Sequence, residues 1–173
     1  MQRILVVGPS GSGKTTTARR IADQLNLPHT ELDAIHWQPD WRELALAEFR
    51  ARVGEIVAAD AWVIDGNYSK VRELILARAD TIVYLDLPLW LCAARLLRRS
   101  LRRALTREEL WAGNRESLFT TFFSSDSVIY YTIRTQRRRR RQYAAIQSDP
   151  VYAHIQFVHL RALREVDAWL RGL

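Results

Sequence analysis

The stretch "VVGPSGSGKTTTARR" at residues 6–20 decides the fold of this chain. Before it, residues 3–8 form a short β-branched run that ends in glycine, which indicates a buried strand. After it, residues 14–26 follow a helical pattern. Gly8, Gly13, Lys14 and Thr15 match the pattern G-x-x-x-x-G-K-[ST] between that strand and that helix. The stretch therefore predicts a phosphate-binding loop, made of Gly8, Pro9, Ser10, Gly11, Ser12, Gly13, Lys14, Thr15 and Thr16.

The chemistry of phosphate explains why these residue types occur at this spacing. Glycines let the backbone wrap closely around phosphate oxygens, and the helix that begins near Lys14 adds its positive N-terminal end. The chain has only two lysines, Lys14 and Lys70, in a sequence otherwise rich in arginine. A compact lysine ammonium suits so tight a loop better than a planar guanidinium, and the Thr15 hydroxyl can bind Mg²⁺. ATP and Mg²⁺ are the expected cofactors.

The rest of the chain alternates strand and helix patterns. Further strands are expected at 28–33, 61–66, 80–88 and 154–160, with helices at 41–60, 89–103 and 161–172 and a helical segment over 104–147 broken near "FFSSDS". Several strands are apolar on both faces, which requires parallel strands covered by crossover helices on both sides. The sequence predicts one α/β domain over residues 1–173, a three-layer sandwich with a five-stranded parallel sheet.

Three carboxylates follow predicted strands and are candidates for the site. Asp65 and Asp86 each end a strand, where one of them can serve Mg²⁺ and either can instead cap the following turn. Asp33 follows the second strand and should share the crevice of the phosphate loop, where it can orient or deprotonate an acceptor hydroxyl. His36, Trp37 and Trp41 come soon after it and can stack on a ring. A packed or surface histidine explains His36 equally well, and a core position is slightly favoured for the two tryptophans.

Charge is concentrated in one segment of the chain. The formal net charge is +7, and residues 95–141 hold thirteen arginines against four carboxylates. This segment should meet nucleotide phosphates, nucleic acid or acidic lipid, or else form a solvated helix around the run of arginines at 137–141. The single cysteine, and apolar segments too short or too interrupted for a signal peptide or a membrane span, lead us to expect a cytoplasmic protein without a membrane partner.

At this point the motifs resemble those of a known group. "GPSGSGKTT", "WVIDGNY" and "ADTIVYLDLP", followed by an arginine-rich segment, resemble the adenylate kinase group of P-loop nucleotide kinases. The longer series "ELDAIHW", "WVIDGNY", "LDLP" and "GNRES" is similar to bacterial adenylate kinase relatives labelled DNA topology modulation proteins. This resemblance covers almost the whole chain.

The resemblance implies a sheet in the order 2-3-1-4-5, an acceptor-binding region at about 34–60 and a lid at about 104–126. Strand three then neighbours strand one, which favours Asp65 over Asp86 on the Mg²⁺ side. Arg134 and Arg138, one helical turn apart, match the arginines that the group places after its lid. The chain has "ELDAIH" and "DGNYSK" where adenylate kinases carry the residues that hold AMP, unless Lys70 substitutes. Asp33 looks more like the aspartate of shikimate or gluconate kinases, whose acceptor is a hydroxyl.

Two functions remain in competition. The favoured one is a kinase that moves the γ-phosphate of ATP to a nucleotide or a small hydroxyl compound, with Lys14, Asp33, Arg134 and Arg138 as catalytic residues and Thr15 and Asp65 at the metal. The alternative is a regulatory protein that binds a nucleoside triphosphate and contacts nucleic acid through its arginines. The sequence names neither the acceptor nor the oligomeric state.

Overall fold

A computed structural model describes residues 1–106, 109–114 and 128–173, without the side chains of 104 and 128–136. Its centre is a parallel sheet of five strands, which lie side by side in the order β2-β5-β1-β6-β7. These strands are β1 (Arg3–Val7), β2 (His29–Glu31), β5 (Trp62–Asp65), β6 (Thr81–Leu85) and β7 (Gln156–Leu160). Because all five run in the same direction, their carboxyl ends meet at one edge of the sheet.

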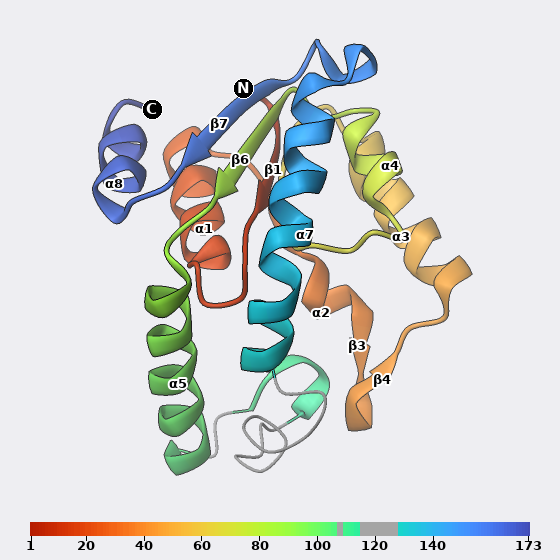
Figure 1. Cartoon of the computed structure of the whole chain (residues 1–173). Coiled ribbons are helices and arrows are strands. Elements are labelled where there is room, and N and C mark those ends of the chain that lie inside the picture. The colour runs from red at the N-terminus through yellow and green to blue at the C-terminus, as the bar shows by residue number, and fades with distance from the viewer. Residues whose placement is uncertain (107–108, 115–127) are drawn as a thin grey trace.

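Helices cover both faces of this sheet (Figure 1). They are α1 (Lys14–Leu25), α2 (Leu32–His36), α3 (Leu46–Ala58), α4 (Arg72–Leu76), α5 (Leu89–Thr106), α7 (Val128–Ser148) and α8 (Leu163–Arg171). One core cluster joins the sheet to α3, α4 and α7, and a second joins its opposite face to α1, α5 and α8. Alternate residues of β1 supply the two clusters, Leu5 and Val7 to the first and Ile4 and Val6 to the second. The predicted α/β architecture with a parallel sheet is confirmed.

A short hairpin that the sequence did not predict lies between α2 and α3. Its strands β3 (Trp37–Gln38) and β4 (Arg42–Glu43) are antiparallel and form a second sheet, joined by the 3-10 turn η1 (Pro39–Trp41). The helix expected at 41–60 therefore begins only at Leu46. Asp40 and Trp41 adopt positive φ angles of 60° and 55°, which a continuous helix cannot contain.

The hairpin also changes the strand numbering. The expected order 2-3-1-4-5 is wrong as numbered, because β3 and β4 are counted in the chain before the strand that lies next to β1. In space the sheet consists of the segments 29–31, 62–65, 3–7, 81–85 and 156–160, in that order. Asp65, at the end of β5, is thus beside the strand that leads into the phosphate loop.

The predicted lid at about 104–126 lies mostly outside the described residues. What is described of it is the end of α5 and residues 109–114 with the 3-10 turn η2 (Trp111–Gly113), and α7 begins after it at Val128. Within the described part of the chain, every helix is too short or too polar to cross a membrane. A last 3-10 turn, η3 (Pro150–Tyr152), joins α7 to β7.

Candidate active site

The predicted phosphate loop connects β1 to α1 and is closed by its own backbone. The Ser12 N–H donates to the Pro9 carbonyl at 3.1 Å, and the Thr17 N–H donates to the Gly13 carbonyl at 2.9 Å, which starts the helix. Gly11 and Gly13 adopt φ angles of 79° and 91°, which side-chain-bearing residues rarely take. Helix α5 packs directly against this loop, since a Cβ on Gly11 would lie 2.3 Å from the Cys92 carbonyl oxygen.

Lys14 reaches back across the loop at the start of α1. Its Nζ donates to the Pro9 carbonyl at 3.2 Å. Burial lowers the pKa of the Lys14 ammonium below its ordinary value of 10.5, whereas the charges of Asp33 and Asp65 act in the opposite direction. Lys14 therefore lies near two of the three candidate carboxylates, as a kinase site requires of the group that contacts the transferring phosphoryl.

Asp65 lies beside Thr15 at the edge of the sheet. The Thr15 hydroxyl donates to Asp65 Oδ1 at 3.1 Å, and the other carboxylate oxygen, Oδ2, is 2.8 Å from His29 Nε2. A hydroxyl and a carboxylate next to a phosphate loop are the oxygen ligands that Mg²⁺ takes together with phosphate oxygens and water. These two residues fit the ion expected from the sequence.

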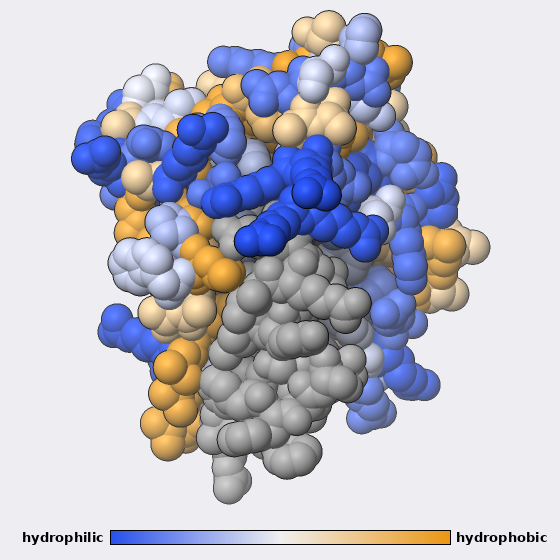
Figure 2. Space-filling model, in the orientation of Figure 1, coloured by the Kyte–Doolittle hydropathy of each residue, from blue (hydrophilic) through white to orange (hydrophobic). Residues whose placement is uncertain are grey.

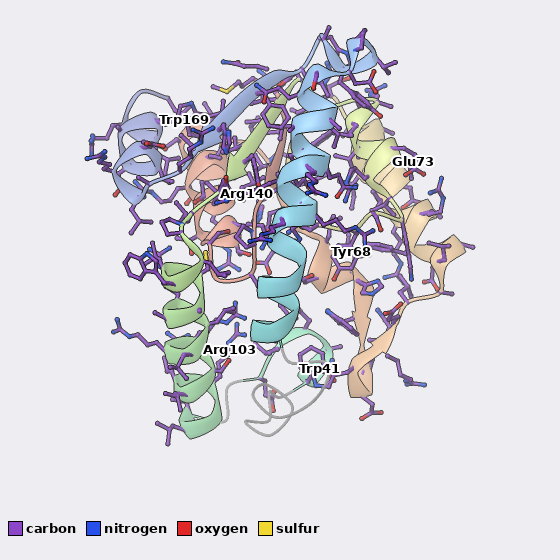
Figure 3. The ribbon with its side chains drawn as sticks, in the orientation of Figure 1. Trp41, Tyr68, Glu73, Arg103, Arg140 and Trp169 are labelled. Atoms are coloured by element: carbon purple, nitrogen blue, oxygen red, sulfur yellow. The ribbon has the colours of Figure 1, made fainter. Side chains whose placement is uncertain are left out.

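Asp86, the alternative to Asp65, is engaged elsewhere. Its side chain is buried, with Arg140 Nε 2.8 Å from Oδ1 and His159 Nε2 3.3 Å from Oδ2. Figure 3 shows Arg140 extending from α7 toward the ends of the strands. The partners of Asp86 come from α7 and β7, whereas Asp65 contacts the Thr15 hydroxyl at the start of α1, so the geometry favours Asp65 for the metal.

Asp33 lies in the first turn of α2 and pairs with a tyrosine that the sequence analysis did not single out. Tyr68, in the loop between β5 and α4, donates its hydroxyl to Asp33 Oδ1 at 2.5 Å (Figure 3). Burial and the charge of Asp33 raise the pKa of Tyr68 far above its ordinary value, so the phenol stays protonated and can only donate to an ionised carboxylate. The hydrogen bond fixes one oxygen of Asp33 and points to the other as the acceptor of a further proton or hydrogen bond.

The region expected to hold the acceptor contains an aromatic cluster. The His36 ring is buried and lies about 5 Å, centroid to centroid, from the rings of Trp37, Phe49 and Tyr68. Burial lowers the pKa of His36, so the imidazole is neutral near pH 7. Trp41, at the tip of the hairpin, is exposed on its surface and packs edge-on against Trp37. His36 is a packed residue, and the two tryptophans line the outer side of this region.

Lys70 is paired with a carboxylate of the hairpin. Its Nζ lies 3.3 Å from Glu43 Oε2 on β4, and the two side chains are each more than half exposed. An exposed pair of this kind is weak and can be displaced by a ligand. A role for Lys70 in acceptor binding stays a prediction.

Arginines of α7 and α5 lie around the predicted site. Arg139, on α7, and Arg99, on α5, lie close enough to Lys14 to lower its pKa, so they contribute positive charge at the loop. Arg138 is exposed and, with Arg72 and Arg139, lines a small cavity of about 110 Å³. The side chain of Arg134 lies outside the described residues. The catalytic roles of Arg134 and Arg138 remain predictions. Arg95 of α5 contacts the loop directly, because its Nη1 donates to the Ser12 carbonyl at 3.3 Å, and Arg99 and Arg139 lie near Lys14.

Exposed arginines gather on one part of α7. Figure 2 shows strongly hydrophilic side chains gathered over the middle of α7, where Arg137, Arg138, Arg140 and Arg141 are exposed. Such a surface attracts an anion to the carboxyl edge of the sheet. Taken together, the edge presents a phosphate loop, a hydroxyl–carboxylate pair for Mg²⁺ and a separate carboxylate held by a tyrosine.

Several solved structures share this fold. A shikimate kinase from Bacteroides thetaiotaomicron superposes with a TM-score of 0.60 at 16% identity, covering 99% of this chain and 95% of that one. A gluconokinase from Sinorhizobium meliloti 1021 gives 0.55 at 20% identity, with 99% and 92% covered. A sugar kinase from Janibacter gives 0.53 at 18% identity, with 99% and 93% covered. At these identities the likeness establishes a P-loop kinase-like fold.

The sequence match to a known family covers less of the chain than the structural matches do. Residues 4–86, slightly less than half of the chain, match the family described as ATPase family associated with various cellular activities (AAA). No curated protein matches the chain in sequence. The matched range runs from β1 through the loop to the end of β6, so it includes the loop and Asp65 as well as Asp33 and Tyr68. The narrower resemblance to DNA topology modulation proteins stays a prediction.

Proposed function

We propose that this chain is an ATP-dependent kinase that transfers the γ-phosphate to a hydroxyl group of a small-molecule acceptor. The observation that carries the proposal is the position of Asp33. It lies near enough to Lys14 to influence its pKa, yet it is bound by Tyr68 and not by the Thr15–Asp65 pair. One carboxylate is thus on the metal side of Lys14 and another is available to an acceptor.

The residues divide the work of phosphoryl transfer. Backbone N–H groups of the loop and the Lys14 ammonium bind the β- and γ-phosphates and stabilise the charge that develops on the transferring group. Thr15 and Asp65 would hold Mg²⁺, which would neutralise charge on the phosphate oxygens. The free oxygen of Asp33 orients the acceptor hydroxyl and takes its proton, while Tyr68 keeps the carboxylate in place. Arg99 and Arg139 add positive charge around Lys14.

The fold supports the same conclusion by analogy. The structures it resembles are those of a shikimate kinase, a gluconokinase and a sugar kinase, whose names specify small hydroxyl compounds. Fold alone does not carry function, so the proposal rests on Asp33, Tyr68 and Lys14. The acceptor's identity is left open, and a nucleotide remains one candidate.

The test compares Asp33→Asn with Asp40→Asn. ADP production is followed with ATP, Mg²⁺ and a panel of shikimate, gluconate, other small hydroxyl compounds and nucleoside monophosphates. Asp33→Asn should bind an unreactive ATP analogue like the wild type but lose at least ~10²-fold in acceptor-dependent turnover, the scale of a positioned acid–base group. Asp40 is exposed and already has a left-handed backbone that asparagine tolerates, so Asp40→Asn should behave as wild type.

Two results would contradict this function. A fall in ATP affinity as large as the fall in turnover would place Asp33 in the metal site or the fold. The competing function, nucleic-acid binding through the arginines of α7, is favoured if no acceptor in the panel stimulates ADP production and DNA binds tightly with a steep salt dependence. Against that function, Arg140 is bound to Asp86 and Arg139 acts on Lys14, so part of the arginine run serves the kinase-like site.

A further inference from the structure

A histidine stands behind the carboxylate on the metal side of the site. His29 is the first residue of β2, and its Nε2 lies 2.8 Å from Asp65 Oδ2. Both side chains are largely buried, with 14% of His29 and 6% of Asp65 exposed. An ionised carboxylate can only accept hydrogen bonds, so Nε2 carries the proton and donates.

This contact follows from the parallel pairing of β2 with β5. His29 is in register with Val63, two residues before Asp65, and its side chain reaches along the neighbouring strand to the carboxylate. Asp65 is therefore held from two sides. His29 binds Oδ2 from β2, and Thr15 binds Oδ1 from α1.

We infer that His29 is a positioning residue that orients Asp65 toward Mg²⁺ bound at the phosphate loop. The inference rests on the proposed function, since the ion is expected only with nucleotide. An aspartate has two rotatable side-chain bonds, and the contact of His29 with Oδ2, added to that of Thr15 with Oδ1, restricts both. Groups that hold a metal ligand in this way commonly change metal affinity by about 10–100-fold when removed.

The competing explanation is that His29 only stabilises the edge of the sheet. The nucleotide itself separates the two explanations, because ADP can be bound with or without Mg²⁺. A positioning role affects the gain in ADP affinity that Mg²⁺ provides, whereas a purely structural role affects ADP affinity in both conditions alike. Mg²⁺ also associates with free ADP in solution, but this association is the same for all variants, so it cancels when their gains in ADP affinity are compared.

The experiment measures ADP affinity by calorimetry in saturating Mg²⁺ and again in EDTA. In His29→Leu the gain from Mg²⁺ should fall by about 10–100-fold, while ADP affinity in EDTA stays within about twofold of the wild type. His29→Asn, whose amide is too short to reach Asp65, should behave like His29→Leu. His29→Gln, whose amide reaches as far as Nε2, should recover most of the gain.

The chain offers a matched control in His159. This histidine also contacts a buried aspartate, Asp86, but the other oxygen of Asp86 is bound by Arg140, whereas that of Asp65 is bound by Thr15. His159→Leu should keep the full gain from Mg²⁺. Circular dichroism at increasing temperature checks that each variant is folded, and the polar His29→Asn keeps the comparison possible if His29→Leu does not fold.

Two outcomes would overturn the inference. One is a full Mg²⁺ gain in both His29→Leu and His29→Asn. The other is an equal loss of ADP affinity with and without Mg²⁺, which would make His29 structural. A wild-type chain that binds no ADP in either condition would overturn the proposed function itself, which is a different result from either of these.

Discussion

Two glycines of the phosphate loop differ in what surrounds them, and the difference sets the cost of replacing them. Gly11 and Gly13 both have positive φ, 79° and 91°. A left-handed conformation costs an L-residue roughly 1–2 kcal/mol, so this strain is common to Gly11→Ala and Gly13→Ala. What differs is the space for the added methyl group.

At Gly11 the new Cβ would lie 2.3 Å from the Cys92 carbonyl oxygen and 2.9 Å from Leu96 Cγ. The main chain of α5 cannot yield like the tip of a side chain, and overpacking of this kind costs about 1–3 kcal/mol more. At Gly13 the nearest atom is Arg95 Nη1 at 3.5 Å, an ordinary contact with a flexible group. The expected losses are therefore about 2–5 kcal/mol for Gly11→Ala and about 1–2 kcal/mol for Gly13→Ala.

Urea unfolding without nucleotide, followed by tryptophan fluorescence and circular dichroism, measures these losses. With a slope of about 1–3 kcal/mol per molar urea, the midpoint of Gly11→Ala should lie roughly 1 M below that of Gly13→Ala. Gly54→Ala is the control, because Gly54 lies inside α3 with no atom within 4 Å of a built Cβ, and alanine should stabilise it by about 0.5–1 kcal/mol. Equal losses for Gly11→Ala and Gly13→Ala would refute the packing of α5 against the loop.

Three further predictions concern α7, the aromatic cluster and the hairpin. Replacing Arg134 and Arg138 together by Ala should lower turnover by at least ~10²-fold with little change in ATP affinity. Arg141→Ala, an exposed change on the same helix, should leave turnover unchanged. Steady-state kinetics measures the turnover, and calorimetry measures the ATP affinity. Because the pKa of His36 is lowered in the folded chain, the unfolded chain takes up the proton first, so the free energy of unfolding should fall as the pH drops below 6.5. His36→Phe should flatten that dependence in urea titrations at several pH values, and an unchanged slope would contradict it. The Trp41 N–H donates a hydrogen bond to Asn114 Oδ1 at 3.0 Å, so Asn114→Ala should speed hydrogen exchange at the Trp41 amide. Asn114→Asp keeps an acceptor and should keep that amide protected.

The nucleotide side of the site could be predicted from the sequence because it is local. Gly8 to Thr16 are contiguous, and the strand before them and the helix after them show clear periodicities. The five sheet segments were also predictable, since apolar β-branched runs mark buried parallel strands. Asp65 was placed beside the loop through the resemblance to adenylate kinases, and its contact with Thr15 agrees with that placement.

The acceptor side, the histidine that contacts Asp65 and the hairpin depend on contacts that no local pattern reveals. Tyr68 meets Asp33 and His29 meets Asp65 across about 35 residues of sequence, and single polar residues at such distances carry no periodic signal. Residues 41–43 of the hairpin were predicted as the start of a helix at 41–60, because the apolar residues of that segment are spaced for one helix face. It is held instead by Asn114, which donates to the Gln38 carbonyl at 2.9 Å and accepts from the Trp41 N–H. Tertiary contacts overrode local propensity there.

The central claim, that this chain binds the phosphates of ATP through Lys14, is tested most directly by comparing its only two lysines. Calorimetry with an unreactive ATP analogue and Mg²⁺ is carried out on the wild type, Lys14→Ala and Lys70→Ala. Lys14→Ala should fold but lose measurable binding, whereas Lys70→Ala, which removes an exposed partner of Glu43, should bind the analogue like the wild type. Wild-type affinity for the analogue in a folded Lys14→Ala chain would contradict the account.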